Sequence, residues 1–298
     1  MTDDLTGNPP KPDTSGLNIV VCIKQVPDSA QIRVHPVTNT IMRQGVPTII
    51  NPYDLYALEE ALRLRDQYGG VVTVLCMGPP MAEDALRRAL GLGADRAVLI
   101  TDRRFAGSDT LATSFALATA LATIAQDRPI DIVFTGKQTI DGDTAQVGPG
   151  IARRLGLNQL TYVSAIDSID LGKRELVVRR RAEGGVQVLQ SRLPCLITVM
   201  EGINDLRRGS IQDLLRAARA DVTVWSAEQA GVTNPMMCGL RGSPTVVKRV
   251  FAPAPRDEPA EMVTTEAKRP AQVAEAVLDL LFARNPKLEA DLAARKGA

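Results

Sequence analysis

The sequence is poor in aromatic residues, in histidine and in paired cysteines. Phe, Trp and Tyr make up 3% of the 298 residues, so a cofactor stacked between aromatic side chains is not expected. His35 is the single histidine, which excludes most metal sites and any mechanism that needs several imidazoles. The four cysteines form no CxxC motif, and Cys22, Cys76 and Cys195 lie in apolar runs typical of buried thiols. We therefore expect no metal site, and ligand binding by backbone amides and small residues.

Long apolar runs and an excess of charge are also missing. No stretch of about 20 apolar residues occurs, so we expect no membrane span. The 35 Lys and Arg residues balance 34 Asp and Glu residues, which argues against nucleic acid or an anionic membrane as a partner. Residues 1–16 are polar and have the layout of neither a signal peptide nor a transit peptide. We predict a disordered N-terminal arm over residues 1–16 and a cytoplasmic, bacterial-type protein.

Short apolar runs alternate with amphipathic segments along the first two thirds of the chain. The runs rich in β-branched residues, which suit strands buried on both faces, are residues 17–26, 71–77, 96–101, 131–135 and 195–200. The helical segments between them are residues 54–68, 81–91 and 108–125. Strand–helix–strand alternation of this kind predicts an α/β fold with a doubly wound, mostly parallel sheet over residues 17–222.

The pattern changes toward the C-terminus. Residues 175–181 and 186–192 are extended segments on either side of Glu183-Gly184-Gly185, which predicts an antiparallel β-hairpin. Residues 223–268 show no clear periodicity, and residues 271–284 form an amphipathic helix pattern. We therefore predict that residues 223–298 form an extended tail with a closing helix that packs on a partner subunit.

A candidate phosphate-binding segment, residues 136–150, reads GKQTIDGDTAQVGPG and follows a predicted buried strand. Ligands of parallel α/β sheets bind at this carboxyl edge. Residues 145–155 form a predicted helix, whose first N–H groups and positive dipole end suit a phosphate. The residues that open this helix are Thr144, Ala145, Gln146 and Val147. The segment matches neither GxGxxG nor the Walker pattern, so a plain turn capped by Asp143 stays an alternative.

Small residues and acids share this segment. Gly142 and Ala145 would let a ligand approach the backbone closely. Asp141 and Asp143 would repel a phosphate, although an Asp can also accept a hydrogen bond from a ribose hydroxyl or cap the helix. The segment therefore predicts a nucleotide site.

Other predicted strand ends meet the same edge of the sheet. Lys24 follows the first strand, Asn51 precedes a helix, and Met77 and Gly78 end the second strand. Each has a plain alternative, as a surface lysine, a helix cap or a simple strand end, and only together do they indicate a ligand. We add them to the cofactor site with Gly136 and Gln138. No side chain can be named as a catalytic acid or base.

A short helix over residues 210–219 places Ile211, Leu214 and Leu215 on one side. We interpret it either as a packed surface helix or as a docking helix for a redox partner.

Five ordered motifs resemble one known family. They are VVCIKQVPD, NPYDLYALEEALRL, MGP followed by ALRRALGLGAD, GKQTIDGDTAQVGPGIA, and RRRAEGGVQVLQSRLPCLIT. Over residues 17–220 the chain is similar to the β subunit of electron-transfer flavoproteins, the FixA-like group included. The resemblance implies an adenine-nucleotide α-hydrolase-like fold, a nucleotide site in this chain, and an α subunit that carries the electron-transferring FAD.

The resemblance also assigns roles to residues. By position, the family's nucleotide contacts fall on Cys22, Asn51, Met77, Gly142, Ala145, Gln146 and Val147, and the same motifs contain Lys24, Asp141, Asp143 and Thr144. Ile211 stands where similar proteins present an apolar anchor to acyl-CoA dehydrogenases. The resemblance implies a redox partner such as a quinone oxidoreductase or an acyl-CoA dehydrogenase, and the flanking residues, which are rich in Arg and diverge, leave its identity open.

The resemblance implies that the nucleotide is FAD or AMP. Residues 141–149, DGDTAQVGP, are similar to members that bind FAD in this site and bifurcate electrons from NADH, with ferredoxin or flavodoxin as one acceptor. The resemblance therefore implies FAD and NADH, with a non-bifurcating subunit that holds structural AMP as the alternative.

Two alternatives from another class are a stand-alone ATP-binding or ATP-hydrolysing protein and a stress-type ATP-binding regulator. The first would need a loop such as SGGxDS after the first strand, where this chain has KQVPDSAQ. The stress-type regulator does not account for the predicted hairpin and the tail, which a partner subunit explains better.

Overall fold

The computed structural model describes residues 16–28, 33–34, 41–42, 47–245, 261–266, 269–288, 290 and 292. The expected N-terminal arm, apart from Gly16, and His35 lie outside these residues. The chain divides into two units, Met1–Phe251 and Ala252–Ala298. The second unit contains helix α6 (Pro270–Arg284), which confirms the helix expected over residues 271–284.

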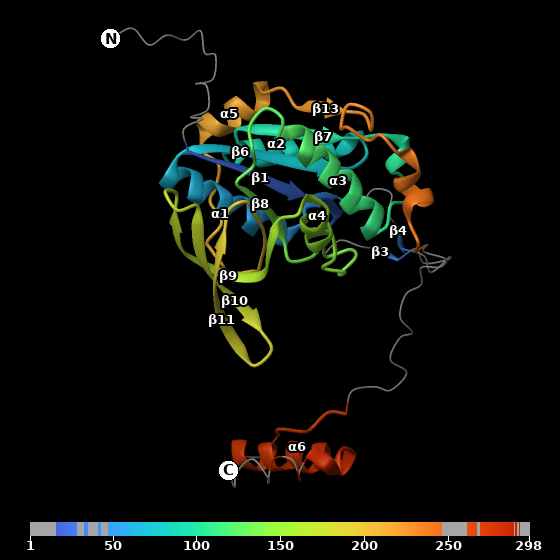
Figure 1. Ribbon diagram of the computed structural model, residues 1–298. Coiled ribbons are helices and arrows are strands. Elements are labelled where there is room, and N and C mark those ends of the chain that lie inside the picture. The colour runs from blue at the N-terminus through green and yellow to red at the C-terminus, as the bar shows by residue number, and fades with distance from the viewer. Residues whose placement is uncertain are drawn as a thin grey trace. The chain divides into compact units, whose positions relative to one another are not determined.

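Nine strands of the first unit form one sheet (Figure 1). Its order is β11-β10-β9-β12-β8-β1-β6-β7-β13. The strands are β1 (Leu17–Ile23), β6 (Gly70–Met77), β7 (Arg96–Ile100), β8 (Ile132–Gly136), β9 (Asn158–Asp170), β10 (Glu175–Ala182), β11 (Gly185–Arg192), β12 (Cys195–Val199) and β13 (Thr223–Trp225). All neighbours run parallel except β9, β10 and β11, which pair antiparallel. The expected doubly wound, mostly parallel sheet is confirmed.

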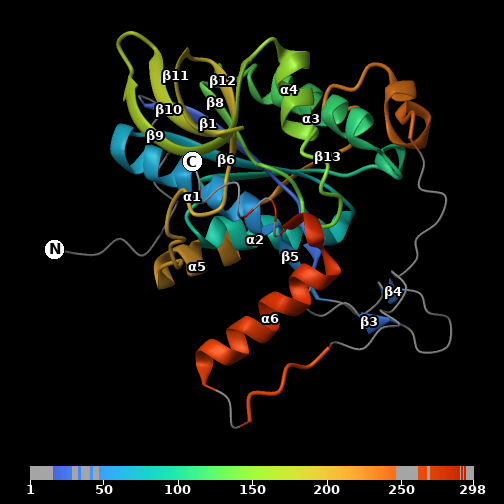
Figure 2. The ribbon, with the colours of Figure 1, turned by 90° about the horizontal axis from the view of Figure 1, so that it is seen from below.

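Helices cover both faces of the sheet (Figure 2). Helices α1 (Pro52–Tyr68), α2 (Glu83–Gly91) and α5 (Ile211–Arg219) pack on one face, and α3 (Thr110–Ile124) and α4 (Val147–Leu155) on the other. Side chains of β1 alternate between the two cores: Ile19 and Val21 join the first, Val20 and Cys22 the second. This double burial explains why the central strands read as continuous apolar runs.

The order of the strands reverses at β1. From β1 the chain passes through α1, β6, α2 and β7 toward one edge, and after α3 it returns to β8 on the other side of β1. The carboxyl ends of β1 and β8 therefore flank the topological switch point, where open α/β sheets bind their ligands.

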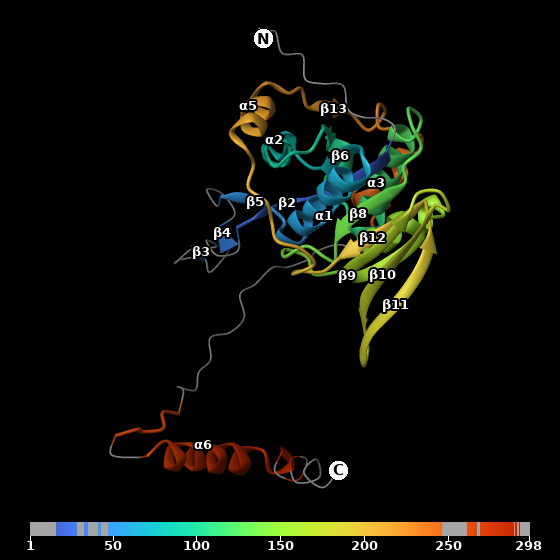
Figure 3. The same ribbon diagram turned by 90° about the vertical axis from the view of Figure 1, so that its left-hand side faces the viewer.

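The hairpin expected around Gly184 is confirmed. Strands β10 and β11 pair in register from Glu175↔Arg192 to Ala182↔Gly185 and extend away from the helices (Figure 3). Gly184 and Gly185 have φ of 81° and 152°, conformations that residues with a Cβ rarely adopt. Short two-stranded sheets join β2 (Gln25–Pro27) to β5 (Thr48–Ile50) and β3 (Arg33–Val34) to β4 (Ile41–Met42).

The segment after residue 222 differs from the expected extended tail. Strand β13 pairs with β7 at the edge of the main sheet, and Ala227, Ala230 and Val232 are buried against α3. The 3-10 turns η4 (Pro235–Met237) and η5 (Gly239–Gly242) follow in the same unit. Residues 223–245 are therefore integral to the α/β unit, because pairing with β7 orders a strand that is too short to show a pattern.

In the described parts of the chain, no helix has both the length and the apolar character that crossing a bilayer requires.

Candidate functional site

A cleft of about 870 Å³ opens at the carboxyl ends of β1, β6, β7 and β8. It lies at the switch point of the sheet, and its volume is in the range of small-molecule and cofactor sites. Among the residues expected at a nucleotide site, those that line the cleft are Cys22, Lys24, Met77, Gly78, Gly136, Gln138, Gly142, Thr144, Ala145, Gln146 and Val147. The fold thus gathers side chains from four strand ends around one space.

The backbone of residues 144–148 lines this cleft. Asp143 and Ala145 have φ of 48° and 54°, in the left-handed region, and Gln146 follows in the right-handed region. Alternation of this kind turns successive N–H groups toward one side and forms an anion-binding concavity. Within the described residues, the N–H groups of Thr144, Ala145 and Gln146 donate to no protein acceptor.

Helix α4 begins at Val147, two residues later than expected, and its N-cap is Gln146 rather than Asp143. The Gln146 side chain does not cap the helix but accepts a hydrogen bond from the Thr110 hydroxyl at 2.7 Å. The N–H groups of Val147 and Gly148 therefore have no capping side chain. Helix α3, whose start also faces the cleft, is capped by Asp109, so the open positive helix end is that of α4.

Three glycines of the segment have different tasks. A Cβ at Gly136 would lie 2.6 Å from both Asp54 Oδ1 and Tyr53 Cβ, and one at Gly148 would lie 2.8 Å from Thr198 Cγ2. These two glycines permit packing within the protein. A Cβ at Gly142 would meet only Thr139 Oγ1, at 3.5 Å, so the small size of Gly142 leaves space on the cleft side rather than inside the fold.

Three expected contact residues lie outside the lining and support it. Asn51 is fully buried; its Nδ2 donates to the Gln138 carbonyl at 2.9 Å and its Oδ1 accepts from the Ile140 N–H at 3.1 Å. Asp143 accepts a hydrogen bond from Gln138 Nε2 at 2.8 Å. Asp141 forms an ion pair of 2.7 Å with Lys24. Asn51 is the N-cap of α1 by position, as one alternative expected, but its side chain makes no capping hydrogen bond. It bonds instead to the backbone of Gln138 and Ile140 in the loop after β8.

Asp141 is thereby neutralised beside the cleft. Partial burial pushes the pKa of its carboxyl upward, but hydrogen bonds and charge from Lys24 outweigh burial and leave the pKa below its ordinary value. The repulsion expected between Asp141 and a phosphate is therefore offset within the protein.

Asp54 was not among the expected site residues, yet it lines the cleft. It is 4% exposed, and its two carboxyl oxygens accept the Lys24 N–H at 2.8 Å and the Gly136 N–H at 3.1 Å. One side chain therefore fixes the ends of β1 and β8 at the switch point. Burial raises the pKa of Asp54 to about 7, against the lowering effect of the Asn51 side chain, of these two hydrogen bonds and of the Lys24 charge.

The loop after β7 is a second part of the lining that the sequence did not indicate. Residues 101–110 form one wall of the cleft, with Arg103, Phe105 and Ser108 among them. Asp102 accepts hydrogen bonds from the N–H groups of Arg104 and Ala227, so the segment after β13 holds this wall. The only available signal was its place after a predicted strand.

All four cysteines are free and buried. Burial raises the pKa of each thiol, so the thiols stay protonated at neutral pH. Buried thiols were expected at Cys22, Cys76 and Cys195, and Cys238 is a fourth. Cys22 therefore contributes shape to the cleft rather than a nucleophile.

The expected partner residues lie together on α5. Ile211, Leu214 and Leu215 are exposed by 78%, 56% and 55%. Leu214 also contacts α2, because a Cβ at Gly91 would lie 3.1 Å from Leu214 Cδ2. The helix is capped by Ser210, and the described chain shows no element over its apolar side chains.

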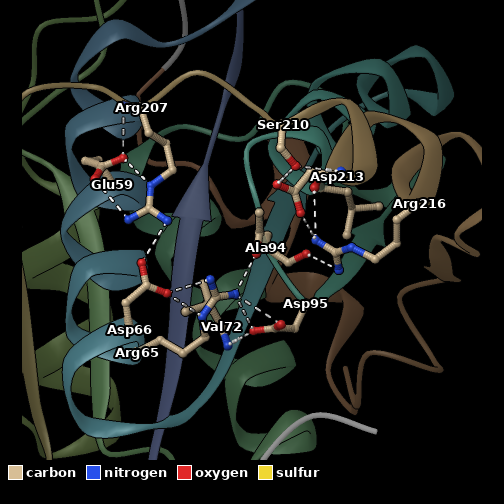
Figure 4. A network of polar contacts seen from close by, with 12 residues as sticks. Glu59, Arg65, Asp66, Val72, Ala94, Asp95, Arg207, Ser210, Asp213 and Arg216 are labelled. Carbon is tan, nitrogen blue, oxygen red and sulfur yellow. Dashed lines mark hydrogen bonds and ion pairs between the residues drawn. The ribbon is translucent and has the colours of Figure 1, made fainter. Parts of the chain in front are cut away.

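Ion pairs hold the segment before α5 and α5 itself (Figure 4). Arg207 forms two hydrogen bonds to the Glu59 carboxylate of α1, at 2.8 and 3.1 Å, and an ion pair of 2.9 Å with Asp66. Arg216 of α5 donates to the Ala94 carbonyl at 3.1 Å. Since Glu59 is buried, this network sets the position of α5 on the α1 and α2 face.

The fold and the cleft define a doubly wound α/β protein with a ligand cleft at the switch point of its sheet. A family model described as electron transfer flavoprotein domain matches residues 38–230. The chain therefore belongs to the electron transfer flavoprotein family, among its FixA-like β subunits. Proteins of this family transfer electrons and are associated with flavin, and their β subunits pair with an α subunit.

Individual relatives agree with this assignment. Protein FixA of Azorhizobium caulinodans is 69% identical over 279 residues, which cover 93% of this chain and 98% of that protein. The electron transfer flavoprotein subunit beta of Clostridium acetobutylicum is 48% identical over 233 residues, 78% of this chain and 87% of that protein. Subunit CarD of the caffeyl-CoA reductase-Etf complex of Acetobacterium woodii is 44% identical over 249 residues, 83% of this chain and 92% of that protein.

Proposed function

We propose that the cleft binds FAD and that this chain, within an αβ complex, passes electrons from NADH by bifurcation. The observation that carries the proposal is the backbone of residues 144–148, which lines the cleft at a helix start without a capping side chain. Among the described residues, the N–H groups of Thr144, Ala145 and Gln146 have no protein acceptor. Fixed N–H dipoles of this kind suit a pyrophosphate, which has no hydrogen to donate.

The space around this backbone favours a dinucleotide over AMP. The cleft of about 870 Å³ reaches from the phosphate segment to the loop of residues 101–110, and Gly142 leaves room beside it. Lys24 neutralises Asp141, one of the two acids of the segment. A pyrophosphate carries its charge at any pH near neutrality, so the pairing of this acid lowers the repulsion that it would meet.

The chain's own residues would bind, orient and shield the cofactor. The N–H groups of residues 144–148 would hold the phosphates, and Asn51 would keep the loop of Gln138 in place by its two hydrogen bonds. Met77, Cys22 and Leu117 give part of the wall an apolar character. Bound FAD supplies the hydride and single-electron chemistry.

The proposal includes the partners. An α subunit with its own FAD would receive one electron, and ferredoxin or flavodoxin the other. The redox partner downstream, a quinone oxidoreductase or an acyl-CoA dehydrogenase, would dock at Ile211, Leu214 and Leu215. We further propose that residues 223–298 contact the α subunit, including α6, and that the protein is cytoplasmic.

The test is the nucleotide content of the purified αβ complex, released by denaturation and separated by chromatography. Two FAD molecules per heterodimer and reduction of both by NADH are expected. One FAD with one AMP would show that the cleft holds a structural mononucleotide. A colourless monomer that hydrolyses ATP would contradict the proposal altogether.

A further inference from the structure

Asp54 occupies an unusual place for a carboxyl group, at the base of a cleft where we propose that an anionic nucleotide binds. Its side chain is almost fully buried and accepts hydrogen bonds from two backbone N–H groups, and the Asn51 side chain is a further hydrogen-bond partner. These N–H groups, of Lys24 and Gly136, end the two strands that flank the switch point. In the described chain, Asp54 takes part in no ion pair.

The nearby cations are engaged elsewhere. The ammonium group of Lys24 bonds to both oxygens of Asp141, at 2.8 and 2.7 Å. The ammonium group of Lys137 lies 2.9 Å from a Glu201 oxygen and 4.6 Å from the centre of the Tyr53 ring. A buried carboxylate without a cation in contact is costly, and the usual relief is protonation.

The other two carboxyl groups that line the cleft have stronger support for their charge. Hydrogen bonds from the N–H groups of Arg104 and Ala227 keep the pKa of Asp102 below its ordinary value. At Asp109, partial burial raises the pKa, but donors from Leu111, Ala112 and Thr245 more than offset it. Asp54 is the one of these three at which burial outweighs the hydrogen bonds, and its pKa is raised to about 7.

We infer that Asp54 is a positioning residue that fixes the ends of β1 and β8 and takes up a proton when an anionic nucleotide fills the cleft. The inference rests on the proposed occupation of the cleft, although not on whether the nucleotide is FAD or AMP. A second negative charge in this confined space raises the free energy of the ionised carboxylate, whereas the protonated form keeps both acceptor positions. Nucleotide binding and proton binding therefore favour each other.

Several other titratable or charged groups lie near Asp54 in the described chain. The titratable and charged groups around Asp54 are Cys22 and Lys24 at the end of β1, Cys76 in β6, Tyr53 in α1, Lys137 and Asp141 after β8, and Asp102, Arg103 and Asp109 across the cleft. The thiols are held protonated by burial. Hydrogen bonds hold the pKa values of Asp102, Asp109 and Asp141 below the ordinary value. Asp54 is the carboxyl group among them whose pKa lies near neutrality, at about 7.

The experiment is calorimetry of FAD binding to the αβ complex after removal of its β-subunit nucleotide, in buffers of different ionisation enthalpy. FAD is a clean probe, because its pyrophosphate does not titrate near neutral pH. The wild type is expected to take up almost no proton at about pH 5 and a growing fraction above about pH 7. Its affinity is expected to fall by up to tenfold per pH unit in the upper range.

Two variants test whether Asp54 is the group that takes up the proton. Asp54→Asn cannot change charge and should bind FAD without proton uptake, whereas Asp102→Asn, which removes a neighbouring charge in the same cleft, should keep the uptake. Equal uptake in the wild type and Asp54→Asn, or none in either, would overturn the inference and leave the proposed function intact. Failure of the wild type to bind FAD while it binds AMP would contradict the proposed function alone, and the same comparison of proton uptake with Asp54→Asn is then made with AMP. Failure to bind either nucleotide would overturn the inference as well.

Should Asp54→Asn not fold, infrared difference spectroscopy of the wild type decides. With ¹³C-labelled aspartate, FAD binding at about pH 8 should produce one new C=O band of a protonated carboxyl group. A difference spectrum without this band would overturn the inference.

Discussion

The Lys24 ammonium group lies 2.7 Å from an Asp141 carboxylate oxygen, and this pair joins the end of β1 to the loop after β8. The two residues are 117 positions apart in the sequence. Their side chains are 45% and 33% exposed, so the pair contributes at most about 1 kcal/mol to stability. Its importance lies in the charge that it balances at the edge of the cleft.

Replacing Lys24 by Met should therefore weaken nucleotide binding without unfolding the protein. Asp141 would then stand uncompensated beside the phosphates, and we expect the affinity for FAD to fall about tenfold, an effect that shrinks at high ionic strength. The measurement is FAD binding to the αβ complex at two salt concentrations. The double variant Lys24→Met with Asp141→Asn should recover most of the loss; if it does not, Lys24 acts in some other way.

Asn51 should matter for the loop more than for the helix that it precedes. Asn51→Ala would leave the Gln138 carbonyl and the Ile140 N–H without their partners, at a cost of about 2 kcal/mol. We expect a melting temperature several degrees lower and a lower affinity for the nucleotide. Asn158→Ala, which removes an exposed hydrogen bond to the Arg192 carbonyl, is the matched control and should change neither.

The stability of the protein should depend on pH through Asp54. The pKa of its carboxyl is about 7 in the folded protein against 3.8 for the free group, so the folded state holds the proton more tightly. The contribution is complete below pH 3.8 and is lost as pH rises to about 7. The stability difference between the wild type and Asp54→Asn should therefore shrink with rising pH, by up to about 1.4 kcal/mol per unit. Parallel curves from pH-dependent melting would contradict this assignment.

Ile211 and Leu214 should separate docking from packing on α5. Ile211 is 78% exposed, so Ile211→Asp should lower the affinity for the redox partner at least tenfold and leave the melting temperature unchanged. Leu214 also contacts α2, so Leu214→Asp should lower both the affinity for the redox partner and the melting temperature. Electron-transfer rates measured against partner concentration test this. Unchanged rates for Ile211→Asp would remove α5 from the proposed interface.

Much of the fold could be predicted because its signals are local. The runs of β1, β6 and β8 are apolar on both faces, and the hairpin of β10 and β11 carries its turn residues in the sequence. Strand β13 could not be predicted, since three residues, Thr223–Trp225, show no period and gain their structure by pairing with β7.

The sequence predicted where the cleft lies better than it predicted the conformation and contacts of individual residues there. Motifs at the strand ends located the cleft, because parallel strands bring their carboxyl ends to one edge. The left-handed backbone at Asp143 and Ala145 leaves no mark in the sequence, since neither residue is a glycine. The role of Asp54 could not be predicted either, because only the tertiary structure brings the N–H groups of Lys24 and Gly136 to its carboxyl group.

The most direct test of the account places a bulky acid at Gly142, where a Cβ meets only Thr139 Oγ1 at 3.5 Å and folding should survive. Gly142→Glu would fill and charge the proposed pyrophosphate space. Gly172→Glu, at the turn before β10, is the control. The measurement is FAD per αβ heterodimer: we predict two for the wild type and for Gly172→Glu, and one for Gly142→Glu with an unchanged melting profile of the apoprotein. Two FAD molecules in a folded Gly142→Glu complex would contradict the account.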